Sequence, residues 1–389
     1  MKIAIIGAGA SGLVASIKLK EKYPQDEVFL YERMDCVGKK IKATGNGKCN
    51  IGNIGTPYQR YTNHEYVKKI LDDYNQEDFL LELGIPTKTM NGDGLYPISE
   101  SAANVVKVLE RKAQSLGVNI VLNTRLIDYQ VDKEKIKLQL DKYQTNVDRL
   151  VIAVGGRSNP NLGSDGCLYE VLAKHGYKVT ELKPGLCPIR IHEDVKPLFG
   201  QRFHTIASLF IDGRLVHEEY GEVMFKKDGL SGIVIMNLSS LINRKKIKEA
   251  KIYLAVLNKD QAIITVKDLY RISQGNINPL LSFVNEGVAN YIYKIAEIVP
   301  DHYFSYEECQ KIAKIAAAMS FTYRESYDYE YSQVTIGGVS VDNLNDDLSS
   351  KHEDHVYFLG EIIDVDGPCG GYNLKWAIGS AAKCADYFK

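Results

Sequence analysis

The chain has 389 residues, with 48 basic and 49 acidic side chains, a length that predicts two or three domains with ample core. This balance leaves no overall field to attract nucleic acid or an anionic membrane, so we expect neither as a partner. No apolar run is long enough to span a bilayer, and the first predicted strand begins at Lys2, so we expect no signal peptide.

The cysteines and histidines of the chain show no metal-binding spacing. Seven cysteines are widely spaced, and none forms a Cys-x-x-Cys pair. Their odd number and spacing argue against both disulfides and zinc, so we expect no metal site. A reduced, cytoplasmic compartment fits this usage best.

The first predicted element is a buried strand over residues 2–6 that runs into a glycine-rich turn. Gly7 allows the tight bend, Gly9 lets a pyrophosphate touch the backbone, and Gly12 lets the following helix pack close to the strand. A second strand ends at Glu32, where a carboxylate can accept hydrogen bonds from a ribose. This order predicts a dinucleotide site with phosphates at the helix N-terminus. The alternative, a glycine-rich turn without a ligand, leaves Glu32 unexplained.

Residues 38–50 follow closely and contain four lysines and three glycines. A plain NAD domain has no evident need for such a loop, whereas exposed N–H groups and small residues can wrap the pyrophosphate and ring edge of a larger cofactor. Asn46 and Asn50 supply directional donors that could orient a polar ring. A solvated basic loop is the alternative.

The next elements predict an α/β domain. Residues 104–116 have helical periodicity and lead to a strand, and residues 126–147 alternate as an antiparallel meander. Residues 148–154 form a buried strand that ends on Gly155 and Gly156. Ligands of α/β sheets lie beyond such strand ends.

The character of the sequence changes near Pro184. Strands are predicted at 204–211 and 218–225, and helices at 260–272, 288–299 and 306–319. The tyrosine-rich run 321–331 alternates like a strand, and either roofs a flavin pocket or forms an amphipathic edge. Residues 356–361 return to a buried strand. We therefore expect a discontinuous cofactor domain at 1–185 and 332–389, with residues 186–331 inserted as a substrate-side domain.

A last helix is predicted to open at Gly371, Tyr372, Asn373 and Leu374. Its amides can face an anionic or polar ring edge, such as the N1–C2=O side of a flavin. The alternative is an ordinary helix start capped by Asn373.

Four stretches together resemble the aminoacetone-oxidase-like, or BaiN-type, FAD-dependent oxidoreductase family. They are residues 42–50, residues 153–158 with 163–166, residues 229–232, and residues 360–367 running into 371–377. The matches occur in family order and span nearly the whole chain. Two departures stand out: Lys227 takes the place of the usual histidine before the third motif, and Cys369 stands where the family often has threonine.

The resemblance implies a Rossmann-like, glutathione-reductase-type FAD-binding domain with an inserted β-barrel and a small helical part. By position, the residues implied to contact FAD are Gly7, Gly9, Ala10, Ser11, Gly12, Glu32, Arg33, Lys39, Lys40, Gly45, Asn46, Gly47, Asn50, Leu126, Ala153, Val154, Gly155, Gly156, Gly360, Glu361, Gly371, Tyr372, Asn373 and Leu374.

The implied function is hydride transfer between FAD and a small organic substrate, with NAD(P)H or oxygen as the redox partner. No separate nicotinamide domain is visible, so NAD(P)H would bind transiently in the substrate cleft. The sequence identifies no catalytic acid or base and no oligomeric state. A non-catalytic flavin-binding sensor or scaffold is the alternative. Flavin-dependent RNA modification is a third option, against which the balanced charge counts.

Overall fold

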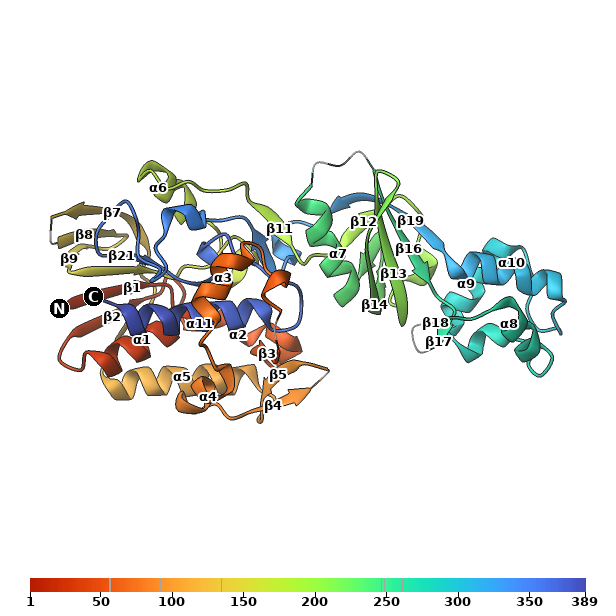
Figure 1. The fold of residues 1–389 in the computed structure, drawn as a ribbon, viewed down its shortest axis with the longest axis horizontal. Coiled ribbons are helices and arrows are strands. Elements are labelled where there is room, and N and C mark those ends of the chain that lie inside the picture. Colours follow the sequence, from red (N-terminus) through yellow and green to blue (C-terminus); the bar gives the residue numbers. More distant parts are fainter. Residues whose placement is uncertain (56, 91, 134, 246, 248, 260–261) are drawn as a thin grey trace. The chain divides into compact units, whose positions relative to one another are not determined.

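The computed structural model describes residues 1–55, 57–90, 92–133, 135–245, 247, 249–259 and 262–389. The chain forms two compact units, one made of Met1–Lys183 and Gln333–Lys389 and the other of Pro184–Ser332 (Figure 1). Each unit has a hydrophobic core of its own. The first unit is therefore assembled from both ends of the chain.

The first unit is built on a five-stranded sheet in the order β21-β10-β1-β2-β6. Every neighbouring pair is parallel, so all five carboxyl ends meet at one edge of the sheet. Short apolar runs form these strands, and both faces are covered, as is usual for parallel sheets. The strands are β1 (Lys2–Ile6), β2 (Glu27–Tyr31), β6 (Asn119–Val121), β10 (Arg149–Ile152) and β21 (Val356–Phe358).

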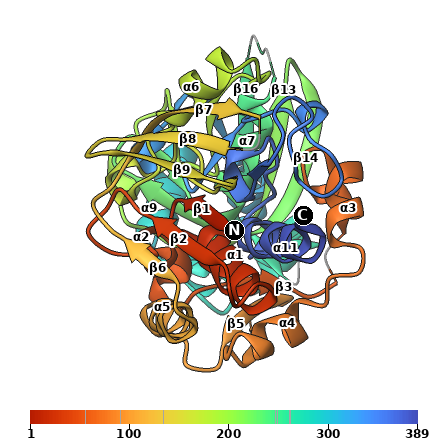
Figure 2. The same ribbon diagram turned by 90° about the vertical axis from the view of Figure 1, so that its left-hand side faces the viewer.

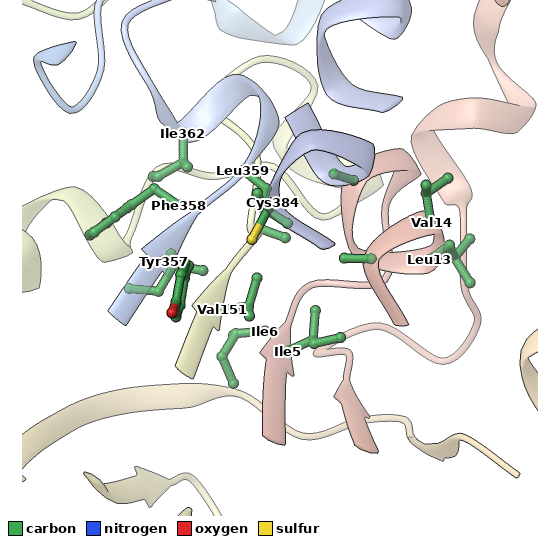
Figure 3. Packing of buried hydrophobic residues seen from close by; sticks show 14 of the residues in the cluster. Ile5, Ile6, Leu13, Val14, Val151, Tyr357, Phe358, Leu359, Ile362 and Cys384 are labelled. Atoms are coloured by element: carbon green, nitrogen blue, oxygen red, sulfur yellow. The ribbon is translucent and has the colours of Figure 1, made fainter. Parts of the chain in front are cut away.

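Helices α1 (Ala10–Lys22), α5 (Ala102–Leu116) and α11 (Tyr372–Tyr387) cover one face of this sheet. The antiparallel meander β7 (Leu126–Asp132), β8 (Lys135–Leu140) and β9 (Gln144–Val147) covers the other face, and α1 and α11 lie side by side (Figures 1 and 2). Figure 3 shows Leu13 and Val14 of α1 and Cys384 of α11 close to the apolar side chains of the sheet. This packing fixes where both helices begin.

Shorter elements complete the first unit. They are α2 (Lys39–Lys42), β3 (Gly52–Asn53), α3 (His64–Leu71), α4 (Gln76–Glu82), β4 (Thr87–Met90), β5 (Gly94–Pro97), α6 (Leu168–Lys174) and β20 (Val334–Ile336), with 3-10 helices η1 (Thr44–Gly47), η2 (Tyr58–Arg60), η3 (Pro160–Leu162), η7 (Val341–Asn343) and η8 (Gly360–Ile362). Strand β11 (Lys183–Gly185) carries the chain into the second unit.

The second unit contains a closed barrel in the order β12-β15-β14-β13-β16-β19. Its strands are β12 (Ile189–Ile191), β13 (Arg202–Ile211), β14 (Arg214–Lys226), β15 (Gly229–Ser231), β16 (Ala250–Ala255) and β19 (Met319–Ser326). Along β13, buried and more exposed residues alternate, as expected for a strand with one face in the core. The other elements are η4 (Lys196–Leu198), α7 (Ile233–Asn243), β17 (Asn258–Lys259), β18 (Ala262–Ile263), α8 (Val266–Ser273), η5 (Pro279–Ser282), α9 (Glu286–Ala296), α10 (Tyr306–Ala317) and η6 (Tyr329–Tyr331).

The predicted fold class is confirmed, because a Rossmann-type sheet and an inserted barrel with a small helical part are both present. The helix expected at 260–272 is wrong in its first part. Residues 262–263 belong to β18, the helix begins only at Val266, and residues 260–261 lie outside the described chain. The strand expected at 321–331 ends at Ser326, and a 3-10 turn follows.

A candidate cofactor site at the carboxyl edge of the sheet

The glycine-rich turn after β1 separates two different roles of glycine. A Cβ on Gly7, whose φ is +100°, would lie 2.5 Å from the carbonyl oxygen of Ala153, and a Cβ on Gly12 would lie 1.8 Å from the oxygen of Gly7. A Cβ on Gly9 would meet nothing within 4 Å. Gly7 and Gly12 are therefore required by the fold itself. Gly9 instead borders open space at the start of α1.

Helices α1 and α11 both begin without a capping side chain. Gly9 precedes α1 and Gly371 precedes α11, and neither helix has an acidic residue in its first turn. Their first N–H groups carry the positive end of the helix dipole and suit an anionic or electron-rich group. The side chain of Asn373 does not cap α11. It exchanges two hydrogen bonds of 2.9 Å with the backbone of Gly367, so the alternative of a helix capped by Asn373 is wrong.

Glu32 lies where β2 ends, and backbone donors hold its carboxylate in place. The N–H of Ala8 donates to Oε2 and the N–H of Met34 donates to Oε1, each at 2.8 Å. A carboxylate oxygen has two lone pairs, so each oxygen keeps capacity for a further donor such as a ribose hydroxyl. The backbone oxygen of Glu32 also accepts from Thr124, two residues before the buried Leu126.

The loop 163–166 lies against the same carboxylate. A Cβ on Gly163 would lie 3.0 Å from Cγ of Met34 and 3.9 Å from Oε1 of Glu32. Arg33 forms an ion pair with Asp165, which also accepts from the N–H of Cys167 at 3.1 Å. Burial opposes ionisation of Asp165, but the Arg33 guanidinium and hydrogen bonds from Cys167 together outweigh burial and lower the pKa of that carboxyl. The Arg33 side chain therefore holds this loop through its ion pair with Asp165.

A buried hydroxyl without a hydrogen-bond partner lies beside the glycines that follow β10. The Oγ of Ser164 is buried and has no partner in the described parts of the chain. A Cβ on Gly155 would lie 3.1 Å from this oxygen, and one on Gly156 would lie 2.4 Å from Oγ1 of Thr335. Since buried polar atoms are rarely left unpaired, the Ser164 hydroxyl points to a missing hydrogen-bonding group beside the glycines that follow β10.

Lys40 and Glu361 form a half-buried ion pair. The Lys40 Nζ lies 2.7 Å from Oε2 of Glu361 and 2.5 Å from Oγ of Ser158. The other carboxylate oxygen, Oε1, accepts from the N–H of Thr335 at 2.8 Å and from Ser158 at 3.0 Å. Gly360, whose hypothetical Cβ would lie 2.8 Å from Oγ of Ser11, brings this cluster next to the first turn of α1.

The other predicted residues of the lysine-rich loop have different surroundings. The Lys39 ammonium pairs with Asp35 at 2.7 Å, and Gly45, Asn46 and Gly47 are exposed. The side-chain amide of Asn50 lies 2.8 Å from the carbonyl of Gly52 and 3.3 Å from that of Leu95, so its nitrogen already has two backbone acceptors.

The remaining predicted residues lie at the starts of α1 and α11 and directly after β10. Ala10 and Ser11 open α1, and Ala153 and Val154 follow β10. Tyr372 is buried, and its hydroxyl accepts from Arg60 at 3.1 Å, so Tyr372 fixes the start of α11 through its ring. The thiol of Cys49 is also buried, which raises its pKa to about 11, so it stays protonated and acts in packing.

Sequence reasoning missed Ser158, Ser164, Asp165 and Thr335 as site residues. Three of them lie in the second matching stretch and carry hydroxyl or carboxylate groups, which was the available signal. Thr335 carried no such signal, because it is distant from Gly156 in the sequence and contacts it only in the folded protein. Within the described ranges, no three His, Cys, Asp or Glu side chains are grouped to hold a metal, and no helix is long and apolar enough to cross a membrane.

Curated proteins are similar to this chain over nearly its whole length. The chain is 28% identical over 97% of its length to the 3-dehydro-bile acid delta(4,6)-reductase of Clostridium scindens, of which it covers 96%. It is 26% identical over 98% of its length to the ribosomal RNA dihydrouridine synthase of Escherichia coli, again covering 96%.

Solved structures share the fold. The 3-ketosteroid delta1-dehydrogenase of Sterolibacterium denitrificans has a TM-score of 0.52 at 9% identity, with 99% of this chain and 98% of that chain covered. A quinol-fumarate reductase has a TM-score of 0.51 at 12% identity, with 99% and 70% covered.

The family described as "HI0933-like protein Rossmann domain" matches residues 1–387, nearly the whole chain. This match and the bile-acid reductase relative confirm the resemblance drawn from the four sequence stretches, and with it the expected class, a flavin-dependent oxidoreductase. The chain therefore belongs to the HI0933-like protein family.

Proposed function

We propose that the chain binds one FAD and reduces a small, unsaturated organic substrate by hydride transfer. The observation that carries the cofactor assignment is the pairing of a fixed Glu32 carboxylate with the open space at Gly9, at the uncapped start of α1. A ribose diol and a pyrophosphate are the groups that such a pairing recognises. The unsatisfied Ser164 hydroxyl supports the presence of a further polar ligand group.

Each part of the site has a task in this proposal. Glu32 would accept from the adenosine ribose, while Gly9 and the first turn of α1 would bind the pyrophosphate. Ser164 and the backbone of Gly155 would line the middle of the cofactor. Lys40 and Glu361, held together by Ser158, would face its ribityl part. The free N–H groups at the start of α11 would stabilise negative charge on the ring. When bound, the flavin supplies a group that accepts and donates hydride.

The reductive direction rests on the relatives. A delta(4,6)-reductase and a dihydrouridine synthase both carry names that describe adding hydrogen to their substrates. A small molecule is favoured over RNA because the chain is close to neutral, and the second unit alone carries 18 basic and 18 acidic residues. NAD(P)H would supply the electrons, with oxygen as the competing acceptor.

The cofactor is tested first, by the visible spectrum of the purified protein. Flavin absorbance, either as purified or after addition of FAD, is expected. A protein that stays colourless and gains no flavin peaks on FAD addition contradicts the proposal.

The reaction is tested by anaerobic stopped-flow mixing with NADH and NADPH, followed by a panel of enones and an unmodified ribosomal RNA transcript. Flavin reduction by a nucleotide and reoxidation by an enone are expected. Reoxidation by the transcript alone would move the substrate to RNA. Failure of every donor would favour the non-catalytic sensor or scaffold.

A further inference from the structure

A row of side chains on the barrel surrounds a single glycine. Arg190 of β12 pairs with Gly229 of β15, and Gly229 pairs with Lys226 of β14 on its other side. Laterally paired residues project from the same face of a sheet. Ile189 and Ile191 on either side of Arg190 are buried, so this row occupies the outer face of the barrel.

Gly229 carries no side chain between the two cations. A Cβ at this position would lie 1.9 Å from the carbonyl oxygen of Ile189, so only glycine fits. The ring of Tyr327 contacts both cations. The Arg190 guanidinium is 4.2 Å and the Lys226 ammonium 5.0 Å from its centroid. Lys226 is also 5.3 Å from the ring of Tyr331, which is 51% exposed.

The two cations differ in how their charges are balanced. Arg190 donates to Asp228 at 3.0 Å and has Glu325 at 3.6 Å, and Asp228 also accepts from the hydroxyl of Tyr327. Lys226 has neither a carboxylate partner nor a hydrogen bond within the described residues, and the neighbouring Lys227 adds a further positive charge. Its ammonium contacts only ring faces, which satisfy a cation weakly.

We propose that Lys226, with Tyr327 and Tyr331, binds the carboxylate or phosphate of a small molecule whose flat body packs on the exposed tyrosine ring. The anion would receive the unused N–H donors of Lys226, a charge-assisted contact. Arg190 and Asp228 hold Tyr327 in place. This inference rests on the proposed function, since the ligand would be the substrate or the electron-donating nucleotide. Arg190 lies close in sequence to Pro184, and Tyr327 and Tyr331 lie close to Ser332, the first and last residues of the second unit.

The test uses full-length holoprotein and titration calorimetry with four probes: benzoate, neutral benzamide, inorganic phosphate and NADPH. Lys226→Gln removes the charge, and Lys251→Gln on β16, whose ammonium pairs with Glu249 at 3.1 Å, is the matched control. We expect Lys226→Gln to weaken anion binding by roughly tenfold, as loss of one charge-assisted contact implies, with no change in Lys251→Gln. Tyr331→Ala should weaken benzoate but not phosphate.

If Lys226→Gln weakens the binding of benzoate, the site belongs to a substrate carboxylate. If Lys226→Gln weakens the binding of NADPH and phosphate, the site belongs to the nucleotide. No anion binding by the wild-type protein, equal loss in Lys251→Gln, or equal loss of benzamide overturns the proposal. The flavin spectrum of each variant separates these results from failure of the proposed function, because Lys226 is not part of the cofactor site.

Discussion

At the residue scale, the glycines of the first turn provide a matched pair of substitutions. Gly9→Ala places its methyl group in open space, whereas Gly12→Ala drives one into the oxygen of Gly7. We expect Gly9→Ala to leave the melting temperature of the apoprotein unchanged and to weaken FAD binding by at least roughly tenfold, because the methyl group occupies the place of a phosphate. Gly12→Ala should prevent stable folding. Thermal unfolding and FAD titration check both, and equal FAD affinity in wild type and Gly9→Ala would refute this role.

Glu32 gives a second prediction at this scale. Glu32→Ala should weaken FAD binding by about 1–3 kcal/mol, the usual cost of losing a hydrogen bond to a charged group. Glu32→Gln should lose less, since its amide oxygen can still accept. The apoprotein of Glu32→Ala should also unfold at a lower temperature, because the carboxylate holds the N–H groups of Ala8 and Met34. FAD fluorescence titration measures the affinity, and Glu110→Gln on α5 serves as the control.

Prediction from the sequence succeeds for residues whose contacts are made by neighbours along the chain. Gly12 and Glu32 belong to one short strand–turn–helix–strand unit, so their contacts with Gly7 and Ala8 follow from local spacing. Ser164 and Thr335 enter the site only because distant segments meet at the edge of the sheet. Asn373 shows the converse: its residue type raised the alternative of a helix cap, but its side chain instead forms hydrogen bonds with the backbone of Gly367 in the turn before the helix.

At the element scale, His175 ties three segments of the first unit together. Its ring lies between Glu353 at 2.9 Å and Asp128 of β7 at 3.0 Å, and it stacks on Tyr129 with ring centroids 4.1 Å apart. Burial lowers the pKa of His175, but the two carboxylates outweigh burial, so the pKa lies above its ordinary value of 6.5.

This bridge predicts a pH dependence of stability. Because the folded-state pKa is raised, the stabilisation is complete below about pH 6.5 and is lost as the pH rises through the folded pKa. The difference in unfolding free energy between wild type and His175→Gln should therefore shrink from acidic to alkaline pH. Urea titrations at several pH values measure it, with the exposed His204→Gln as control. A difference that grows with pH would contradict the bridge.

Element prediction fails where a local capping signal competes with periodicity. The helix expected from residue 260 begins at Val266, because Thr265 caps it by accepting from the N–H of Asp268 at 3.1 Å. The pattern Thr-x-x-Asp is itself a helix-start signal and could have set the boundary. Likewise, the helix expected to reach residue 299 ends at Ala296, where Glu297 adopts a left-handed φ of +56°.

At the scale of the whole molecule, each unit has a separate hydrophobic core. We therefore predict that replacing residues 186–331 by a short Gly/Ser linker leaves a folded protein that still binds FAD but no longer turns over substrate. A flavin spectrum and an enone assay test the two halves of this statement. Retained turnover would remove the second unit from substrate binding. Loss of FAD would place part of the cofactor site in the second unit.

The sequence predicted a discontinuous first domain because both ends of the chain carry short buried strands followed by glycines, whereas residues 186–331 lack this pattern. The closed barrel was not derivable from strand patterns alone. Its closure depends on β12 pairing with both β15 and β19, contacts between segments far apart in the sequence.

The two-part origin of the parallel sheet has a consequence for synthesis on the ribosome. The second unit is one continuous segment, Pro184–Ser332, whereas the first needs β21 and α11 from the end of the chain. The unit that starts first is therefore finished last. Until then, the edge of β10 that later pairs with β21 stays open, and an open strand edge invites pairing with other chains. Ribosomes that stall after residue 332 should thus release chains with a protease-resistant barrel and an aggregation-prone N-terminal half.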